Sequence, residues 1–312
     1  MIRLIILPLT IALLIMINAL PAVASNDKYE VEELALQSHG LNLHLSRVSL
    51  LNDGASKDIL LIHGLTYSSH VFDVDYKDYS LVKFLARQGY NVWRLDLTGY
   101  SQSDKISDGL SVNSDYAAED IKAAVDYIFE RNGNKKIDLL GWSWGTVTTS
   151  RFIEKYPEKI RRLVIYAPIF SGVGIGEVEE SYHKNTWEHA ADDFQRDATG
   201  KIDFSVIEPG VEATFLSNCW RYDGNGSPNG GRKDLMVSEN LQLIFVERLT
   251  LPVLIIEGDN DPYINRSMLK TAIVKCPAGS AFVEIAGGGH AMMIEKSHYK
   301  TFRKAVKTFL EN

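Results

Sequence analysis

Short apolar runs recur along the chain at intervals of a few dozen residues. One of them, Ile59-Leu60-Leu61-Ile62, is followed directly by His63-Gly64. A continuous apolar run of this length is typical of a strand that is buried on both faces of a parallel sheet. Similar runs occur at Asn91–Leu95, Ile137–Leu140, Leu163–Tyr166, Val253–Ile256 and Phe282–Ile285. The pattern therefore predicts a large sheet with six buried strands.

The segments before and between these runs have other spacings of their apolar residues. Residues Val31–Leu36 and Leu41–Leu50 lie on either side of His39-Gly40 and predict a two-stranded hairpin. Helical spacing is found between the buried strands, at Leu81–Gln88, Ser114–Arg131, Thr146–Tyr156, Arg266–Lys275 and Ile294–Leu310. Because strand and helix alternate, we expect an α/β fold with a mostly parallel sheet flanked by helices.

The alternation fails once, over residues 169–250. This stretch of about 80 residues carries six large aromatic residues and the Gly-rich loop DGNGSPNGG. The aromatic residues are Trp187, Phe194, Phe204, Phe215, Trp220 and Tyr222. Since the strand pattern resumes afterwards, we interpret 169–250 as a mainly helical cap inserted between core segments 25–168 and 251–312, and we expect two or three of its aromatic side chains to face a pocket.

Residues 1–24 have a different character from the rest of the chain. They read MIRLIILPLTIALLIMINALPAVA, with Arg3 as the only charge and the small-residue triplet Ala22-Val23-Ala24 before Ser25. This pattern predicts a secretory signal peptide that is cleaved after Ala24. The alternative is an uncleaved membrane anchor, because the uncharged stretch is nearly long enough to span a bilayer. We expect a periplasmic or secreted protein that meets the membrane only during export.

Charge excludes one class of partner. The 312 residues contain 33 Lys and Arg against 40 Asp and Glu, which gives a net charge of −7 and a pI near 5.7. Nucleic acid is not expected to bind, because phosphate backbones require a basic surface. Composition otherwise matches an ordinary globular protein, with 45% hydrophobic residues.

The two cysteines, Cys219 and Cys276, allow one disulfide in an oxidising compartment. We favour two separate thiols over a bridge, because sequence gives no distance between them. A zinc or redox role is not indicated, since there is no C-x-x-C motif.

The strongest chemical signal is Gly141-Trp142-Ser143-Trp144-Gly145, which follows one predicted strand and precedes a predicted helix. A serine on such a sharp turn has a strained backbone and projects its hydroxyl out of the sheet. The start of the next helix then directs the backbone N–H of Trp144 to the place where a negative oxygen would form.

A serine hydroxyl needs a general base and an orienting acid to act as a nucleophile. Asp261 follows the strand Val253–Ile256, and His290 follows the strand Phe282–Ile285. Both therefore belong to the carboxyl edge of the sheet, where ligands of such sheets bind. Asp259 competes with Asp261 for the acid role, and we favour Asp261 because it fits the pattern Gly258-x-x-Asp261.

Together these motifs resemble the α/β-hydrolase family, in its capped esterase and peptidase-like branch. The resemblance rests on His63-Gly64, Asp96-x-x-Gly99-x-x-x-Ser103, the serine turn, Gly258-x-x-Asp261 and Gly289-His290, and it spans residues 30–312. It implies that Ser143 attacks, that His290 takes its proton and that Asp261 holds the imidazole. It also implies an oxyanion hole made by the backbone N–H groups of Leu65 and Trp144, and no cofactor or metal.

The chain departs from the family pattern at Thr98 and Ser101, where Arg and Gly are usual, so the packing of that loop is open. A serine nucleophile in place of aspartate weighs against epoxide hydrolase and haloalkane dehalogenase chemistry. We therefore expect a serine hydrolase that cleaves the carboxylic ester of a hydrophobic or aromatic small molecule through an acyl-enzyme. Its oligomeric state is open.

Other functions remain as alternatives. A serine aminopeptidase or amidase would gather acidic cap residues around a substrate amine. Four cap residues are numerous enough for this, but we favour a solvated acidic helix face as their explanation; they are Glu177, Glu179, Glu180 and Glu188. A thioesterase would use the same residues as an esterase. A non-catalytic binding protein is the remaining alternative.

Overall fold

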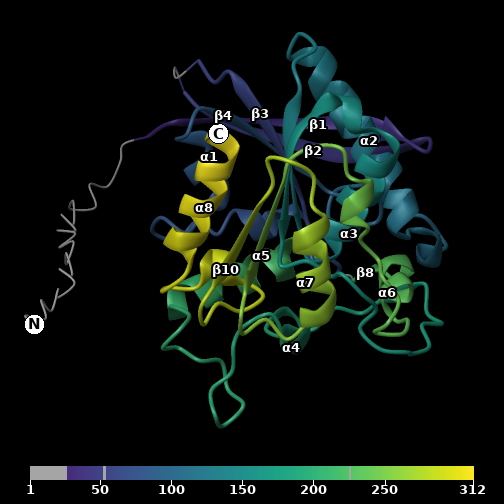
Figure 1. The fold of residues 1–312 in the computed structure, drawn as a ribbon, viewed down its shortest axis with the longest axis vertical. Coiled ribbons are helices and arrows are strands. Elements are labelled where there is room, and N and C mark those ends of the chain that lie inside the picture. The colour runs from purple at the N-terminus through teal and green to yellow at the C-terminus, as the bar shows by residue number, and fades with distance from the viewer. Residues whose placement is uncertain (1–26, 52–53, 225) are drawn as a thin grey trace, which may run out of the picture.

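The fold is built on one eight-stranded sheet with helices on both faces (Figure 1). The computed structural model describes residues 27–51, 54–224 and 226–312. The strands follow the order β1-β2-β4-β3-β5-β6-β9-β10 across the sheet. Their bounds are β1 (Tyr29–Ser38), β2 (Leu41–Leu50), β3 (Lys57–Ile62), β4 (Tyr90–Leu95), β5 (Ile137–Trp142), β6 (Ile160–Tyr166), β9 (Val253–Gly258) and β10 (Ala281–Ile285).

The sheet is mostly parallel, as predicted. Strands β4, β3, β5, β6, β9 and β10 pair in parallel, whereas β2 pairs antiparallel with both β1 and β4. The predicted hairpin is β1 and β2, and its turn residues His39 and Gly40 have φ values of 52° and 75°. Such positive φ values are typical of tight hairpin turns.

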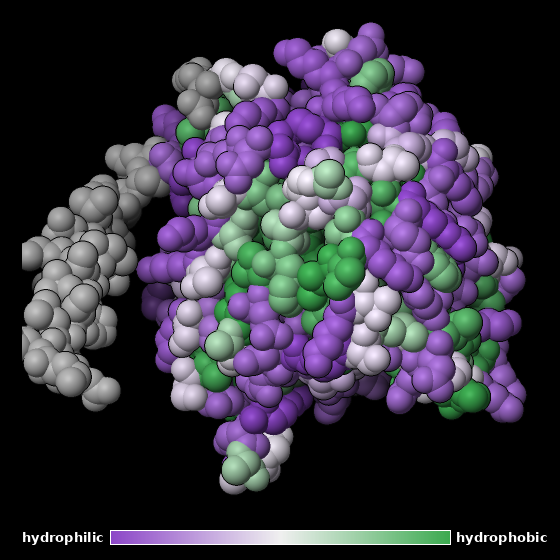
Figure 2. Space-filling view, in the orientation of Figure 1, coloured by the Kyte–Doolittle hydropathy of each residue, from purple (hydrophilic) through white to green (hydrophobic). Residues whose placement is uncertain are grey.

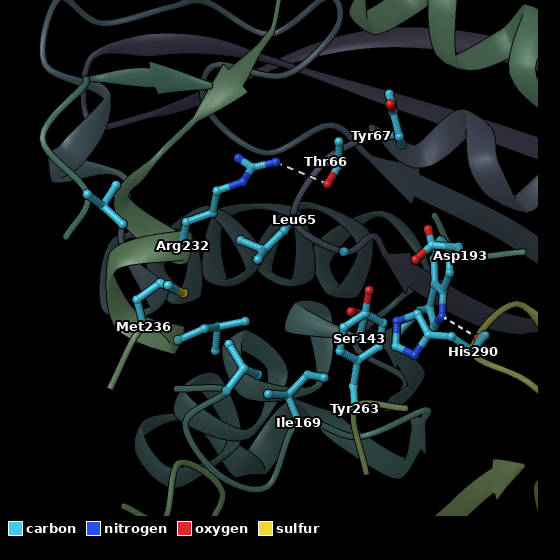
Figure 3. Close-up of a pocket in the computed structure, with 15 residues that line it drawn as sticks. Leu65, Thr66, Tyr67, Ser143, Ile169, Asp193, Arg232, Met236, Tyr263 and His290 are labelled. Atoms are coloured by element: carbon cyan, nitrogen blue, oxygen red, sulfur yellow. Dashed lines mark hydrogen bonds between the residues drawn. The ribbon is translucent and has the colours of Figure 1, made fainter. Parts of the chain in front are cut away.

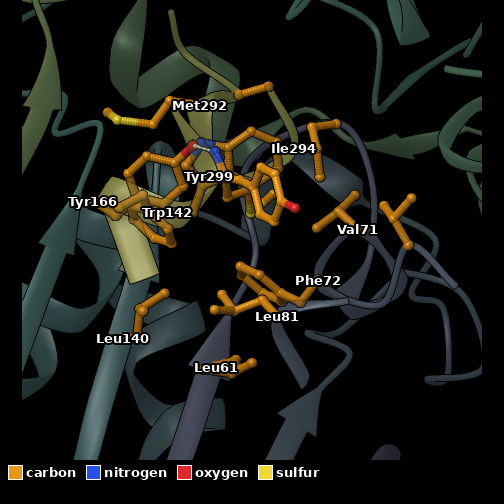
Figure 4. Close-up of a cluster of buried hydrophobic side chains, with 14 of the residues drawn as sticks. Leu61, Val71, Phe72, Leu81, Leu140, Trp142, Tyr166, Met292, Ile294 and Tyr299 are labelled. Atoms are coloured by element: carbon orange, nitrogen blue, oxygen red, sulfur yellow. Dashed lines mark hydrogen bonds between the residues drawn. The ribbon is translucent and has the colours of Figure 1, made fainter. Parts of the chain in front are cut away.

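The central strands are buried on both faces because successive side chains point to opposite sides. In β3, Ile59 and Leu61 belong to one hydrophobic cluster, and Leu60 and Ile62 belong to a second cluster on the other face. Figure 4 shows part of the first cluster, in which Leu61, Leu140 and Phe72 meet side chains from the end of the chain. This arrangement explains the continuous apolar runs in the sequence.

Helices cover the two faces unequally. Helices α1 (Leu81–Ala86) and α8 (Tyr299–Glu311) contribute to the first cluster, and α2 (Ser114–Arg131), α3 (Trp144–Lys155) and α7 (Arg266–Lys275) contribute to the second. Helices α2 and α7 have the predicted bounds. Helix α8 begins five residues later than predicted, because Met292–Ile294 forms a separate 3₁₀ turn and His298 is the N-cap residue.

Strand β10 corrects one prediction, because it lies at the edge of the sheet and is largely exposed rather than buried. It pairs with β9 alone, and Phe282 keeps 36% of its surface exposed. Figure 2 shows apolar side chains gathered between α7 and α8 on this side of the molecule. A short apolar run in the sequence therefore does not guarantee that both faces of the strand are covered by other elements.

The segment predicted to be an insertion leaves the sheet after β6 and returns at β9, the neighbour of β6. Helices are its main regular structure, with α5 the longest, and loops connect them. Its elements are β7 (Tyr182–His183), α4 (Trp187–Ala190), α5 (Pro209–Asp223), β8 (Ser227–Pro228), α6 (Gly230–Leu235) and the 3₁₀ turn Val246–Arg248. Because β6 and β9 are adjacent, the sheet is continuous across this insertion.

Two further predictions concern the N-terminus and the cysteines. The predicted signal peptide, residues 1–24, lies outside the described residues. Within the part of the chain that the structure describes, no helix is long and apolar enough to cross a bilayer. Cys219 in α5 and Cys276 at the end of α7 are free thiols, which confirms the interpretation that we favoured.

Candidate active site

Ser143 occupies the turn between β5 and α3, where the sequence predicts a strained backbone. Its φ is +56°, which lies in the left-handed region that is unfavourable for a residue with a side chain. The backbone N–H of Ser143 donates to the carbonyl oxygen of Tyr166 on the neighbouring strand, at 3.1 Å. The strain is thus maintained by the end of the sheet, as expected at functional turns.

Glycines around this turn let the backbones approach one another. A Cβ on Gly145 would lie 2.5 Å from the carbonyl oxygen of Ile62, and one on Gly141 would lie 2.3 Å from the carbonyl oxygen of Gly145. A Cβ on Gly64 would lie 3.1 Å from the Cβ of Ser143. Helix α3 can therefore begin directly against the loop that follows β3.

The structure brings His290 and Asp261 together. Asp261 follows β9, His290 follows β10, and the imidazole Nδ1 lies 2.8 Å from Asp261 Oδ2 with both side chains buried. Burial alone would lower the pKa of His290, but the charge and hydrogen bond of Asp261 and the charges of Asp193 and Glu295 raise it. With Nδ1 donating to Asp261, Nε2 is left as the proton acceptor.

Asp259, the competing acid, is used differently. Its Oδ1 accepts a hydrogen bond from the backbone N–H of Gly287 at 2.5 Å, so it supports the loop that carries His290. Asp261, and not Asp259, meets the imidazole.

The His290 loop is also held by Glu295, which the sequence analysis missed. This buried carboxylate accepts two hydrogen bonds from the N–H of Gly289, both at 3.1 Å, and lies 2.6 Å from Nδ1 of His298. The side chain of His298 is itself largely buried. Nothing in the sequence pattern marks Glu295, because its role depends on how the loop folds back.

The candidate oxyanion hole lies between the loop after β3 and the start of α3. Among the described residues, no group accepts a hydrogen bond from the N–H of Leu65 or of Trp144. Inside this loop, Nε2 of His63 accepts from the N–H of Leu97, and Nδ1 lies 2.8 Å from the carbonyl oxygen of Gly64. His63 is therefore neutral, which agrees with burial lowering its pKa to about 4.

Ser143 and His290 line one pocket of about 290 Å³ and lie side by side on its wall (Figure 3). Its apolar lining includes Leu65 from the loop after β3 and several side chains of the inserted segment, namely Ile169, Val173, Val178, Leu235 and Met236. Two charged residues also line it: Asp193 on the side of His290, and Arg232 on the opposite side beside Thr66. Neither was a candidate from the sequence.

The expectation about the cap aromatics is wrong, because none of the six lines this pocket. Phe194 and Phe215 are buried against each other in the core, and Trp187 and Trp220 stack at the surface with ring centroids 5.2 Å apart. Three aromatic side chains from outside the inserted segment do line the pocket, namely Tyr67, Trp142 and Tyr263.

The acidic cap residues are likewise not gathered at the pocket. Glu177, Glu179, Glu180 and Glu188 are all exposed, and none lines the cavity. Asp193 is instead the carboxylate of the inserted segment that reaches the site.

The loop after β4 contains the two departures from the family pattern, Thr98 and Ser101. Ser101, which stands where Gly is usual, has a φ of +43°. Its N–H donates to Asp223 at 3.1 Å, and the N–H of Thr98 donates to Asp120 at 3.0 Å. Two buried carboxylates therefore hold this loop.

Comparison with known proteins agrees with this fold. The model of the alpha/beta hydrolase fold family matches residues 58–297, so the chain belongs to the α/β-hydrolase family. It is 26% identical to a proline iminopeptidase from Saccharolobus solfataricus, over 90% of this chain and 93% of that protein. The family and this relative support the interpretation that the protein is a hydrolase.

Other similarities are partial or structural. The chain is 28% identical to the poly(3-hydroxyalkanoate) polymerase subunit PhaC from Haloferax mediterranei, over 35% of its own length, and spans about a fifth (21%) of that relative. A carboxylesterase from Bacillus subtilis has a similar structure, with a TM-score of 0.60 and 19% identity over 90% of this chain and 92% of that one. At this identity the likeness shows the fold alone.

Proposed function

We propose that this protein is an exported serine hydrolase that cleaves the carboxylic ester of a small hydrophobic molecule. The observation that carries the proposal is that His290, hydrogen-bonded to the buried Asp261, lines the same pocket as the strained Ser143. Export rests on the sequence of residues 1–24.

In the proposed reaction, Oγ of Ser143 attacks the ester carbonyl carbon while Nε2 of His290 takes the hydroxyl proton. The imidazolium is stabilised by Asp261. It then protonates the departing alcohol, which leaves the acyl group bound to Ser143. His290 then takes a proton from a water molecule, which attacks the acyl-enzyme. When the acid is released, His290 returns this proton to Oγ of Ser143.

The negative oxygen that forms in both steps would be bound by the N–H groups of Leu65 and Trp144. Two observations support this role: neither group has an acceptor among the described residues, and Gly64 packs against Ser143. Losing one such donor typically slows turnover by about 100- to 1000-fold.

The proposal is tested with a fluorophosphonate probe and a panel of short and medium esters. Wild type should be labelled and should hydrolyse the esters, and Ser143→Ala should lose labelling and about four or more orders of magnitude of turnover. The exposed serine of α7, changed as Ser267→Ala, serves as the control and should behave as wild type. Ester hydrolysis that survives in Ser143→Ala would disprove the assignment.

An amidase or aminopeptidase is the second candidate, and Asp193 favours it. This carboxylate lines the pocket on the side of His290, where a substrate amine could pair with it. A relative named proline iminopeptidase adds weight. Amino-acid anilides, assayed beside matched amino-acid esters, distinguish the two functions: an esterase should leave the anilides intact, whereas an aminopeptidase should cleave them.

A further inference from the structure

Arg232 is a cation in the pocket wall without a carboxylate partner. It belongs to α6, and its guanidinium donates only to neutral oxygens among the described residues. Nη1 bonds to Ser227 Oγ at 3.0 Å, to Asn229 Oδ1 at 3.3 Å and to the carbonyl oxygen of Pro228 at 3.5 Å, and Nη2 bonds to Thr66 Oγ1 at 3.0 Å.

Those bonds leave donors unused. Nη2 donates one of its two hydrogens to Thr66, and no described residue accepts a hydrogen bond from Nε. Nε and the second hydrogen of Nη2 therefore remain available to a ligand, and guanidinium N–H groups donate strong charge-assisted hydrogen bonds to carboxylate oxygens. Burial lowers the pKa of Arg232, but a guanidinium remains charged in proteins. The pocket therefore holds a positive charge with which no described carboxylate forms an ion pair.

The location of Arg232 is fixed relative to the candidate oxyanion hole. Gly231, its neighbour, packs so closely that a Cβ there would lie 2.5 Å from the Trp144 ring and 2.7 Å from Leu65 Cδ2. Thr66, which receives the guanidinium hydrogen bond, follows Leu65 in the chain. Figure 3 shows Arg232 across Leu65 from Ser143, while Asp193 lies on the side of His290.

We infer that Arg232 binds a carboxylate carried by the substrate, so that the preferred substrates are esters whose acyl or alcohol part ends in a negative charge. This inference rests on the proposed ester hydrolysis and adds the substrate class. The carboxylate is directed to the Arg232 side because Asp193 would repel it on the other side. The apolar side chains between the two sides, including Leu65, Ile169 and Met236, accommodate the hydrocarbon spacer.

The test compares neutral and anionic esters with the same leaving group. Wild type is assayed with p-nitrophenyl butyrate and with the mono-p-nitrophenyl esters of dicarboxylic acids from succinate to suberate. We expect higher kcat/KM for one anionic ester than for neutral esters of equal length. Arg232→Gln should lower kcat/KM for that ester by about 10- to 100-fold, the size expected for a charge-assisted pair, and for butyrate by less than about threefold.

Controls separate binding from structural support, because Arg232 also holds Thr66. Thr66→Val removes that hydrogen bond and keeps the charge, so it should not abolish the preference for anionic esters. Arg221→Gln, which changes an exposed arginine of the same inserted segment, should leave both substrate classes unchanged. An equal loss on neutral and anionic esters in Arg232→Gln, or no loss on either, would overturn the inference.

A binding measurement keeps the inference testable if ester turnover itself fails. Ser143→Ala should bind the free dicarboxylates in calorimetry, and the double variant with Arg232→Gln should bind them at least about tenfold more weakly. Equal affinity of the two variants would overturn the carboxylate site. Loss of fluorophosphonate labelling in wild type would instead overturn the proposed hydrolysis and leave the carboxylate site to be judged by this affinity alone.

Discussion

Charges around a single imidazole set the pH at which the proposed general base works. His290 must be neutral to take the proton of Ser143, so activity rises with pH through the pKa of His290. Asp261 and Asp193 both raise that pKa, but only Asp261 is hydrogen-bonded to the ring. Asp193 can therefore be changed without removing the partner that orients the imidazole.

Asp193→Asn should shift the acidic limb of the kcat/KM profile to lower pH, because loss of a nearby negative charge makes the imidazolium easier to deprotonate. The measurement is a pH profile of kcat/KM with a neutral ester, since this profile reports ionisations of the free enzyme. Asp192→Asn, at the exposed neighbouring position, is the matched control, and an equal shift in both variants would contradict the assignment.

Two glycines near Ser143 should respond differently to alanine, because different atoms face them. At Gly64 the new methyl group would meet the side chain of Ser143, whereas at Gly145 it would meet backbone oxygens of Ile62 and His63 at 2.5 and 2.6 Å. Gly64→Ala should lower kcat/KM by about 10- to 100-fold through displacement of the nucleophile. Gly145→Ala should lower the free energy of unfolding by about 2 kcal/mol or more.

Kinetics and urea unfolding, applied to both glycine variants, provide the comparison. Each variant serves as the control for the other, since one affects the nucleophile and the other affects the contact between α3 and β3. A Gly64→Ala protein with full activity would show that Ser143 can shift freely, against the strained geometry described above.

At the scale of elements, the C-terminal end of α5 is joined to the loops after β3 and β4, of which the loop after β3 lines the pocket. Asp223 accepts hydrogen bonds from the N–H and hydroxyl of Ser68, at 2.9 and 2.7 Å, and from the N–H of Ser101 at 3.1 Å. Ser68 lies in the loop after β3 and Ser101 in the loop after β4. One carboxylate of the inserted segment thus ties it to both loops of the sheet.

Asp223 should make stability depend on pH. Burial raises its pKa to about 7 despite these hydrogen bonds, whereas an unfolded aspartate titrates near 4. The folded state therefore binds this proton more tightly, and the stability it contributes is fully present below about pH 4 and is lost as pH rises through about 7. The difference in unfolding free energy between wild type and Asp223→Asn should fall over this range, by at most about 1.4 kcal/mol per pH unit.

Urea unfolding of wild type and Asp223→Asn at pH 5 and pH 8 measures this dependence. Glu212→Gln, a part-exposed acid of the same helix, is the control for general effects of charge. A constant difference between wild type and Asp223→Asn at the two pH values would contradict a raised pKa.

At the scale of the whole molecule, we propose that residues 1–24 direct the protein to export. If residues 1–24 are a signal peptide, protein recovered from the exporting cell should begin at Ser25, because the small residues Ala22 and Ala24 define the cleavage site. Intact mass and N-terminal sequencing provide the measurement. Bulky substitutions at both alanines should block processing, and a full-length protein that stays with the membrane fraction would support the anchor instead.

The apolar runs of the sequence predicted the mostly parallel sheet, and the break in their alternation predicted where a segment is inserted. Continuous apolar runs identified β3 and its parallel neighbours, because strands covered on both faces have no polar side. Ser143, Asp261 and His290 each follow a parallel strand. Because parallel strands end at one edge of the sheet, the sequence predicted that these residues lie at that edge. The exposure of strand β10 and the late start of α8 were not predicted, because the local pattern of a segment does not say which other segments pack against it.

The charges and the lining of the pocket depend on the tertiary structure. Arg232 and Asp193 are ordinary charged residues in the sequence, and they acquire a role because the inserted segment folds back and leaves them without close ionic partners beside Thr66 and His290. The cap aromatics, which looked like the substrate site, pack into the core or stack on the surface instead. Periodicity reports which side of an element is buried. Which elements meet across a cavity depends on contacts between residues far apart in the chain, which local patterns do not encode.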